Sequence, residues 1–386
     1  MSGPFSRLQR ELEERASSGL LRRRHTLTGP QGTRIEVDGK RYVSFCSNDY
    51  LGLASHPRII EALQSGAMRY GAGSGAAHLV TGHSLAHDRL ECELAAFVGK
   101  PSALLFSTGY MANIGVVQAL VDRSDTVFAD KLNHASLNDA MLLSRATVRR
   151  YRHNDLDHLE KMMDEAEAGQ RLVITDAVFS MDGDRALLPE ILELCERHDA
   201  WLLIDDAHGF GVSGAKGRGS ISHFGMDSPL VIYMATLGKA AGVFGAFVAA
   251  EKIVIDTLVN KARSYIYTTA TPPALSVALS ESLVLIDEAD EARAHLKVLT
   301  MRLRQSLKDL KWRLMESDTA IQPLLIGGNE EAMDISMALR ERGIWVAAIR
   351  PPTVPSGTAR LRIALSAQHD LSDIDRLAEA LHELAR

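Results

Sequence analysis

The sequence is poor in cysteine and in aromatic residues, which make up only 5% of it. Its three cysteines, Cys46, Cys92 and Cys195, are odd in number and far apart in the chain. This spacing predicts neither a disulfide framework nor a zinc knuckle, because both need paired, closely spaced thiols. A reducing compartment is the default for such a chain, and we expect a cytoplasmic protein.

An excess of basic residues and long apolar runs are also missing. The chain has 43 Lys and Arg against 49 Asp and Glu, which gives a net charge of −6. This balance argues against a nucleic-acid or anionic-membrane surface. We find no apolar stretch long enough to span a bilayer. The first fifteen residues predict a charged amphipathic helix rather than a secretory or transit signal.

What is present is a 386-residue chain that is 46% hydrophobic, enough for two or three domains with substantial cores. From Ser102 onward, short apolar runs alternate with amphipathic stretches. The runs predict strands at Ala103–Phe106, Thr126–Ala129, Val148–Tyr151, Leu172–Asp176, Trp201–Ile204, Val231–Ala235 and Gly245–Ala249. The stretches between them predict helices at 110–121, 136–144, 155–167 and 189–198. This alternation is typical of a mostly parallel central sheet flanked by helices, an α/β fold.

The two ends of the chain differ from this middle part. Residues 1–45 predict a helix and a short edge hairpin, with Gly29–Gly32 as the turn. Beyond about residue 285 a long helix (289–309) precedes further elements at 321–326, 330–342, 345–349, 360–364 and 371–385. We therefore predict an N-terminal segment (1–45), a large α/β domain (46–285) and a smaller C-terminal α+β domain (286–386).

Two motifs mimic sites that we do not expect. Gly71–Ala76 fits the dinucleotide pattern G-x-G-x-x-A, but a predicted helix precedes it where that site needs a strand, so we interpret it as a loop. His83 and His87 are spaced i, i+4 on the next predicted helix. The glutamate of a zinc-protease motif is absent, so we interpret them as hydrogen-bonded structural histidines and predict no metal site.

Lys239 follows the apolar run Val231–Ala235 and is flanked by glycine and alanine. A lysine beside a buried strand must reach water, pair its charge or lose its proton. The side chain could simply extend to solvent. Alternatively, it could be an amine of depressed pKa that forms a Schiff base. The strand and the lysine alone do not decide between these two interpretations.

Polar residues gather at the ends of the other predicted strands, where sites of open α/β sheets lie. Thr108-Gly109-Tyr110 opens a helix and could cradle an anion or merely make the turn. His134, Ser180, Asp205 and His208 follow three more strands. Asp205-Asp206 could equally be a helix cap or a metal site, but the phosphate motif that usually accompanies magnesium is absent.

Together these residues match the needs of pyridoxal 5′-phosphate. The aldehyde of this cofactor needs a lysine amine, and its pyridine nitrogen needs a carboxylate. Its phosphate needs backbone N–H groups and hydroxyls, and its ring needs a flat neighbour such as an imidazole. We therefore predict pyridoxal 5′-phosphate as the cofactor.

Over nearly its whole length the chain resembles the α-oxoamine synthase family of fold-type I pyridoxal-phosphate transferases. The resemblance rests on Ser47-Asn-Asp-Tyr-Leu-Gly-Leu53, Asn133-His-Ala-Ser136, Phe179-Ser-Met-Asp-Gly183, Asp205-Asp-Ala-His-Gly209, Thr236-Leu-Gly-Lys239 and the stretch from Arg350 to Arg362. The last stretch points to the branch that condenses L-alanine with a pimeloyl thioester in biotin biosynthesis, with coenzyme A or acyl-carrier protein as the thiol. Other members, such as glycine C-acetyltransferase, 5-aminolevulinate synthase and serine palmitoyltransferase, remain alternatives, as does a non-catalytic subunit of the same fold.

The resemblance implies a role for each matching residue. Lys239 would bind the cofactor and act as acid and base, Asp205 would pair with the ring nitrogen, His208 would contact the phenolic oxygen and His134 would stack on the ring. The cofactor would also be contacted by Gly109, Tyr110, Ser180 and Thr236. In the implied homodimer, Thr268 or Thr269 would reach the partner's phosphate. The substrates would be bound by Arg22, Asn48, His134, Thr353 and Arg362.

Four residues differ from what relatives often show. They are Ala76-Ala77-His78 and Phe244, which flank the implied site and concern substrate preference. A further expectation concerns Arg360 and Arg362, which alternate on a predicted strand and so point to opposite faces. We expect Arg362 to bind the amino-acid carboxylate, and we expect replacement of Arg360 by lysine to change alanine binding little.

Overall fold

The computed structural model describes residues 3–167 and 169–386 of the chain. It divides into two compact units. The first comprises Met1–Asn48, Met181–Gly183 and His295–Arg386, and the second comprises Asp49–Ser180 and Asp184–Ala294. The sequence predicted separate N-terminal and C-terminal segments. In the structure they form one unit, in which β2 (Lys40–Ser44) pairs in parallel with β12 (Ile344–Trp345).

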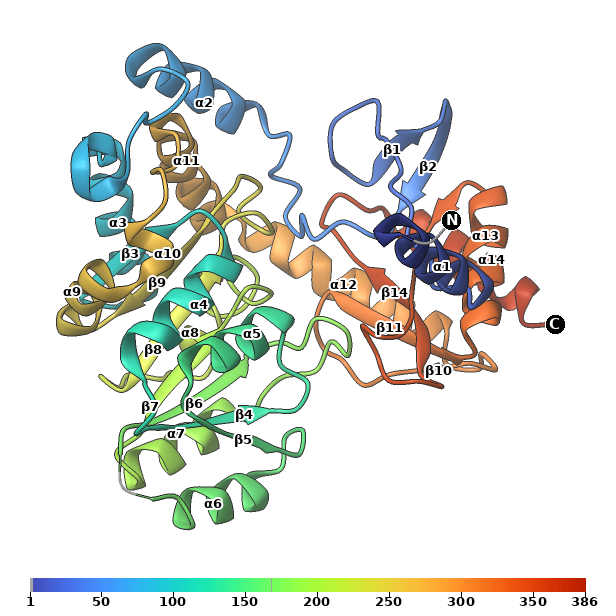
Figure 1. Cartoon of the computed structure of the whole chain (residues 1–386). Coiled ribbons are helices and arrows are strands. Elements are labelled where there is room, and N and C mark those ends of the chain that lie inside the picture. The colour runs from blue at the N-terminus through green and yellow to red at the C-terminus, as the bar shows by residue number, and fades with distance from the viewer. Residues whose placement is uncertain (1–2, 168) are drawn as a thin grey trace. The chain divides into compact units, whose positions relative to one another are not determined.

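A seven-stranded sheet organises the second unit, in the order β3-β9-β8-β7-β6-β4-β5 (Figure 1). The strands are β3 (Ser102–Phe106), β4 (Thr126–Asp130), β5 (Thr147–Tyr151), β6 (Arg171–Asp176), β7 (Trp201–Asp205), β8 (Val231–Thr236) and β9 (Ala246–Ala250). Strands β8, β7, β6, β4 and β5 are parallel, and β9 is antiparallel to both of its neighbours. The predicted α/β fold with a mostly parallel sheet is confirmed, with each strand boundary within one residue.

The apolar runs are continuous because both faces of the sheet are covered by helices. On one face the strands pack against α4 (Gly109–Leu120), α5 (Ala135–Ser144) and α9 (Lys252–Lys261) in a core that includes Val116, Leu137, Leu203, Met234 and Leu258. The middle of each strand is therefore packed with apolar side chains and offers no polar reactive groups. The polar reactive groups lie in the residues that follow the carboxyl ends of the strands.

The first unit contains a three-stranded sheet, β1-β2-β12, and a four-stranded sheet, β10-β11-β14-β13. The chain does reverse direction around the predicted turn at Gly29–Gly32, since Leu27 forms an antiparallel bridge with Val37, but this turn does not join the two hairpin strands. The hairpin of β1 (Arg34–Val37) and β2 turns at Asp38-Gly39, where both residues have positive φ, 52° and 73°. Asp-Gly is the strongest two-residue hairpin signal, because glycine and aspartate tolerate the left-handed region. The predicted strand 345–349 is interrupted at Val346, which separates β12 from β13.

The remaining elements complete the two units (Figure 1). The first unit also has α1 (Pro4–Ser17), β10 (Arg313–Leu314), β11 (Ile321–Gly327), α13 (Asn329–Glu341), β13 (Ala347–Ile349), β14 (Ala359–Ala364) and α14 (Leu371–Leu384). The second has α2 (Pro57–Tyr70), α3 (Leu85–Val98), α6 (Leu156–Asp164), α7 (Leu188–Arg197), α8 (Ser220–His223), α10 (Arg263–Ile266) and α11 (Pro273–Glu288), and α12 (Asp290–Ser306) runs from one unit into the other. Among the described helices, none combines the length and apolarity that crossing a membrane requires.

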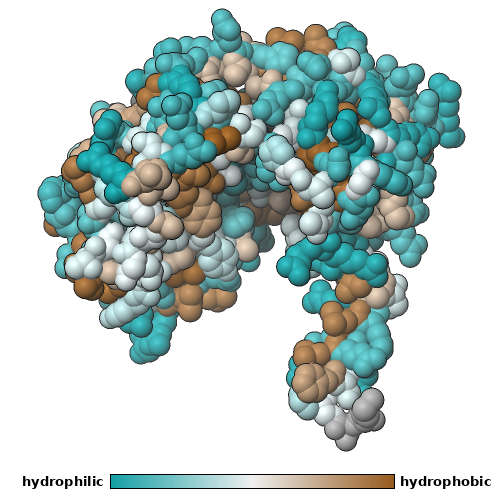
Figure 2. Space-filling view, turned by 90° about the horizontal axis from the view of Figure 1, so that it is seen from above, coloured by the Kyte–Doolittle hydropathy of each residue, from teal (hydrophilic) through white to brown (hydrophobic). Residues whose placement is uncertain are grey.

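Helix α1 buries none of its residues within the chain. Its apolar side chains Phe5, Leu8 and Leu12 are 83%, 54% and 55% exposed. Figure 2 shows the apolar and polar patches along this helix. An amphipathic helix with an uncovered apolar face is a feature of contact with a further surface.

Candidate active site

Lys239 lies in the turn after β8, beside the end of the parallel neighbour β7. Its Nζ is 3.0 Å from Nε2 of His208, and Nδ1 of His208 is 2.7 Å from the hydroxyl of Tyr50. The lysine therefore does not simply extend to solvent. Its amine is half-buried and in hydrogen-bond contact with an imidazole that can exchange a proton with it.

Asp205 is the last residue of β7 and is only 4% exposed. Its carboxylate accepts hydrogen bonds from Asn113 Nδ2 at 2.8 Å and from the backbone N–H of Ala207 at 3.1 Å. Within the described ranges it forms no ion pair, and both of these hydrogen-bond donors are neutral. A buried carboxylate of this kind is suited to pair with a cation such as a protonated pyridine nitrogen.

The neighbouring Asp206 is fully buried and points to different partners. It accepts from the N–H and hydroxyl of Ser220, both at 2.6 Å, and from the Tyr233 hydroxyl at 2.8 Å. Burial raises the pKa of Asp206 to about 6, although these hydrogen bonds oppose the shift. Asp206 thus connects β7 to α8 and β8, which is a structural task.

His134 caps the N-terminus of α5. Its backbone N–H donates to Asp176 at 2.7 Å, and its Nδ1 is 2.8 Å from the Ser136 hydroxyl. Burial lowers the pKa of His134, the Asp205 carboxylate raises it, and the Lys239 ammonium lowers it. These three groups are therefore within electrostatic reach of one another, as predicted for one site.

Gly109 brings the start of α4 against Thr236. A side-chain carbon at Gly109 would lie 2.6 Å from Cγ2 of Thr236, so only glycine fits there. Thr108 caps the helix by accepting from the N–H of Met111 at 3.2 Å. The hydroxyl of Tyr110 bonds to Asp139 on α5, which orients the first turn. The N-terminus of α4 thus lies against Thr236, and the N–H groups of a helix start suit a phosphate.

Two other predicted cofactor contacts lie in loops of the second unit. Ser180 is half-buried and follows β6. Thr268 and Thr269 lie between α10 and α11, and Thr269 is exposed. In the described part of the chain, neither threonine hydrogen-bonds to another predicted site residue.

The first unit contains the predicted substrate arginine. Arg362 is 7% exposed, and its Nη2 donates to Oδ1 of Asn48 at 3.1 Å. Arg360 points to the other side of β14, as expected, where it forms a buried ion pair. It is 3% exposed and donates to Oδ1 of Asp182 at 2.7 Å and to the carbonyl of Met181 at 3.2 Å.

A second basic group lies in the same unit. Nη2 of Arg22 donates to the hydroxyl of Thr353 at 3.1 Å. Burial and the nearby Arg22 charge lower the pKa of Arg350. Among the described residues, neither arginine pairs with a carboxylate, so the two guanidinium groups form an anion-attracting position.

The sequence analysis missed four residues that position the site: Tyr50, Asn113, Asp176 and Arg350. Tyr50 and Arg350 lie inside quoted motifs, and Asp176 ends a predicted strand, so their positions could have indicated a role. Asn113 gave no such signal, because it lies within a predicted helix and meets Asp205 only through the packing of α4 on β7.

The histidine motif was partly misread. His83 precedes Ser84, the cap of α3, and so is not on the helix. His87 is: its Nδ1 accepts from the N–H of Ser84 at 3.0 Å, and its Nε2 is 2.8 Å from the carbonyl of Thr271. Both ring nitrogens of His87 are thus occupied, in agreement with a structural histidine. His78 joins the group, with its Nδ1 2.9 Å from that of His83.

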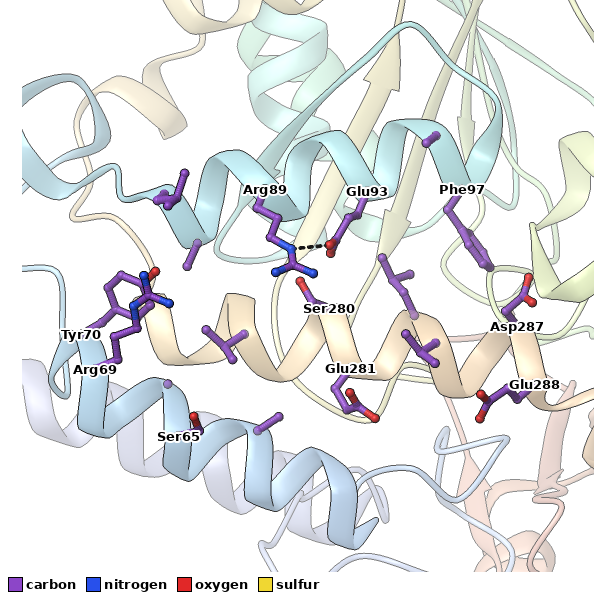
Figure 3. Close-up of a pocket in the computed structure, with 18 of the residues that line it drawn as sticks. Ser65, Arg69, Tyr70, Arg89, Glu93, Phe97, Ser280, Glu281, Asp287 and Glu288 are labelled. Atoms are coloured by element: carbon purple, nitrogen blue, oxygen red, sulfur yellow. Dashed lines mark hydrogen bonds and ion pairs between the residues drawn. The ribbon is translucent and has the colours of Figure 1, made fainter.

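A groove of about 880 Å³ lies elsewhere in the second unit, between α2, α3 and α11 (Figure 3). Arg69, Arg89 and Glu93 line it together with apolar side chains such as Leu85 and Val284. Its lining, as far as the structure describes the chain, includes none of Lys239, Asp205 and His208. This groove is therefore distinct from the cluster of titratable groups.

Known proteins with similar sequences use the same kind of fold and chemistry. Residues 40–381 match the aminotransferase class I and II family. The chain is 61% identical over 379 residues to the 8-amino-7-oxononanoate synthase of Nitrosospira multiformis, covering 98% of this chain and 96% of that protein. It is 58% identical over 377 residues to that of Methylobacillus flagellatus, covering 98% and 95%. The chain belongs to the aminotransferase class I and II family.

Solved structures show the same fold. Sphingomonas wittichii serine palmitoyltransferase is 28% identical with a TM-score of 0.94, covering 99% of this chain and 98% of that one. An 8-amino-7-oxononanoate synthase from Francisella tularensis is 29% identical with a TM-score of 0.77, covering 89% and 97%. The resemblance to fold-type I pyridoxal-phosphate transferases is thereby confirmed. The site fits the family's cofactor, because a buried carboxylate without an ion pair, a lysine amine and a phosphate cradle occur together.

Proposed function

We propose that this chain condenses L-alanine with a pimeloyl thioester and releases CO2, giving 8-amino-7-oxononanoate and a free thiol. Pyridoxal 5′-phosphate is the cofactor. One observation carries the proposal: 61% identity to an 8-amino-7-oxononanoate synthase over 98% of the chain.

The bound cofactor would supply an electron sink for negative charge at the alanine Cα. Lys239 would hold the cofactor and move the proton at that carbon. His208, 3.0 Å from the lysine Nζ, would accept or return a proton and keep the amine basic. Asp205 would keep the ring nitrogen protonated, because a buried carboxylate favours a cation beside it.

Three groups would orient the cofactor. The imidazole of His134 would lie against one face of the ring; Ser136 contacts its Nδ1, and Asp176 fixes the backbone N–H of His134. The N–H groups of Gly109 and Tyr110 and the Thr236 hydroxyl would bind the phosphate. Ser180 would contact the cofactor from the loop after β6. Their geometry supports this assignment, since each lies at a strand end of the second unit.

The substrates would be bound by arginines of the first unit. Alanine offers little besides its carboxylate for recognition, and a planar guanidinium such as that of Arg362 binds a carboxylate through two parallel hydrogen bonds. Asn48, which accepts from Arg362, would orient that guanidinium. Arg22 and Thr353, with Arg350 beside them, would bind the acyl chain, whose distal carboxylate needs a positive partner.

The chain would act as a homodimer in the cytoplasm, without nucleic acid or membrane. Thr268 or Thr269 would reach the phosphate of the partner subunit. The exposed apolar face of α1 supports a further protein surface in contact with the chain.

Product analysis tests the function directly. Purified protein is incubated with alanine and pimeloyl-CoA, and the product is identified by mass spectrometry. The matched pairs are glycine with acetyl-CoA, glycine with succinyl-CoA and serine with palmitoyl-CoA. We expect turnover to be highest with alanine and pimeloyl-CoA. Preference for another pair would place the enzyme in that other branch, and a protein that binds cofactor but turns over none of them would be non-catalytic.

A further inference from the structure

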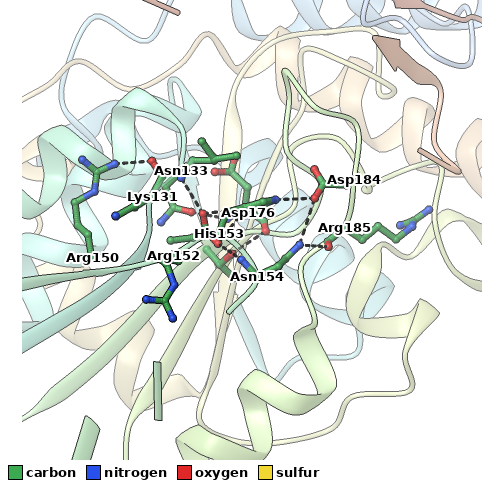
Figure 4. A network of polar contacts seen from close by, with 12 residues as sticks. Lys131, Asn133, Arg150, Arg152, His153, Asn154, Asp176, Asp184 and Arg185 are labelled. Carbon is green, nitrogen blue, oxygen red and sulfur yellow. Dashed lines mark hydrogen bonds and ion pairs between the residues drawn. The ribbon is translucent and has the colours of Figure 1, made fainter. Parts of the chain in front are cut away.

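His153 lies just beyond β5 and is bound by two carboxylates from different elements (Figure 4). Its Nδ1 is 3.0 Å and 3.1 Å from the two oxygens of Asp130, at the end of β4. Its Nε2 is 2.7 Å from Oδ2 of Asp184. Both ring nitrogens must donate to contact two carboxylates, so the ring is an imidazolium. The proposed mechanism does not use this group.

Asp184 closes the loop that follows β6. Its carbonyl accepts from the N–H of Phe179 at 2.9 Å, and Ala186 donates to the carbonyl of Ala177 at 3.1 Å. Asn154 donates to Oδ2 of Asp184 at 3.2 Å and to the carbonyl of Arg185 at 3.0 Å. The two ends of the loop are thus hydrogen-bonded to each other and to Asn154, the residue next to His153.

The middle of this loop carries residues that matter to the site. Ser180 is the proposed cofactor contact. Residues 181–183 belong to the first unit, where Asp182 pairs with Arg360 of β14 and the Gly183 carbonyl accepts from Ser317 and Thr319. Arg362, the proposed carboxylate-binding residue, lies two positions further along β14.

The charge balance makes Asp184 dependent on His153. Asp184 Oδ1 is buried and, among the described residues, has no hydrogen-bond partner. Its ionised form therefore relies on His153 and Asn154 at the other oxygen. The edge of the His153 ring also packs on Phe179, with ring centroids 4.5 Å apart and planes at 90°. Phe179 is the residue directly before Ser180.

We infer that His153 is a positioning residue: its imidazolium, held by Asp130 and Asp184, sets the loop Val178–Arg185 and through it Ser180 and the Asp182–Arg360 pair. The part that concerns Ser180 rests on the proposed function. The part that concerns the loop does not. Removal of the cation would leave the buried Asp130 and the partly buried Asp184 without their common partner, and the loop would move.

Two measurements on the holoenzyme and its apo form test this inference. The variants are His153→Gln and Asp184→Asn. The control is His198→Gln, because His198 faces a single carboxylate, Asp164 at 3.6 Å, and lies at the end of α7 away from the loop. Hydrogen exchange follows residues 177–186, and titration of apo protein with pyridoxal 5′-phosphate gives the cofactor Kd.

We expect His153→Gln to speed exchange in 177–186 and to raise the cofactor Kd, each about tenfold or more, since a lost charge-assisted bond is worth about 1.5–3 kcal/mol. Asp184→Asn should do the same, and the double variant should add little, because both remove one interaction. His198→Gln should change neither quantity.

The inference is overturned if His153→Gln lowers the melting temperature but leaves loop exchange and cofactor Kd at the wild-type values, since His153 would then act only in stability. If His153→Gln does not fold, Asp184→Asn carries the same test. A wild-type protein that binds no cofactor would refute the proposed function alone, because faster loop exchange in the variants would still support the positioning role.

Discussion

The Nζ of Lys239 lies 3.0 Å from Nε2 of His208, although the two residues are 31 positions apart in the sequence. Parallel pairing of β7 and β8 places the turns after both strands at the same sheet edge. His208 is fixed in turn by the Tyr50 hydroxyl at 2.7 Å. The amine and its proton-exchanging neighbour are thus held before any ligand arrives, which is the pre-organisation that a positioned acid–base residue needs.

Replacing Lys239 should abolish catalysis without unfolding the protein. Lys239→Ala removes the amine that contacts His208, so the cofactor could no longer attach covalently. Borohydride reduction and peptide mapping of the wild type should place the pyridoxyl label on Lys239. A label on another lysine, such as the buried Lys100, would refute the assignment.

The two adjacent aspartates should give different defects. Asp205→Asn removes the proposed partner of the ring nitrogen, and a charge-assisted bond worth about 2–3 kcal/mol corresponds to a rate loss on the order of a hundredfold. Asp206→Asn should instead lower the melting temperature, because Asp206 accepts three hydrogen bonds from Ser220 and Tyr233. Kinetics and thermal unfolding of both variants check this. The reverse pattern would mean that Asp206 is the catalytic residue.

Substitution of the two arginines of β14 should have different effects, one on alanine binding and the other on the stability of the fold. Arg362→Lys keeps the charge but loses the two-pronged geometry, so the alanine Kd, followed by the change in cofactor absorbance, should rise about tenfold or more. Arg360→Lys breaks the buried pair with Asp182 and should chiefly destabilise the fold. Equal effects of both substitutions on the alanine Kd would contradict the assignment.

Gly109 should tolerate no side chain. Gly109→Ala introduces a carbon 2.6 Å from Cγ2 of Thr236, so the start of α4 or Thr236 must move. Cofactor Kd should rise about tenfold or more, corresponding to about 1.4 kcal/mol of lost binding. Gly29→Ala is a suitable control, because its added carbon meets nothing within 4 Å. Unchanged cofactor affinity in Gly109→Ala would exclude this turn as the phosphate cradle.

The free energy of unfolding should fall at alkaline pH because His153 loses its proton. Burial lowers the pKa of His153, but hydrogen bonds and charges from Asp130 and Asp184 outweigh it and raise that pKa from 6.5 to about 10. Because the folded state binds this proton more tightly, the stabilisation is complete below about pH 6.5 and is lost as the pH rises towards 10. The difference in unfolding free energy between wild type and His153→Gln should shrink over this window. A difference that is constant with pH would contradict the prediction.

Much of the fold could be predicted from the sequence, because its signals are local. Continuous apolar runs such as Leu172–Asp176 identify strands buried on both faces, and their boundaries were found to within one residue. The hairpin turn was misplaced although Asp38-Gly39 carried the correct local signal, since the proline and glycine of Gly29–Gly32 competed with it. The pairing of β2 with β12 joins residues about 300 positions apart and has no local signal at all.

The sequence by itself determined which chemical groups are present at the strand ends: the Lys239 amine, the Asp205 carboxylate, two imidazoles and a glycine turn. Only the tertiary structure decided how they are paired. It separated the tasks of Asp205 and Asp206, placed Asn113 on the first and Ser220 on the second, and made Arg360 a buried partner of Asp182. The physical reason is that residue type and spacing set what a side chain can donate or accept, whereas its partner depends on which distant elements pack against it.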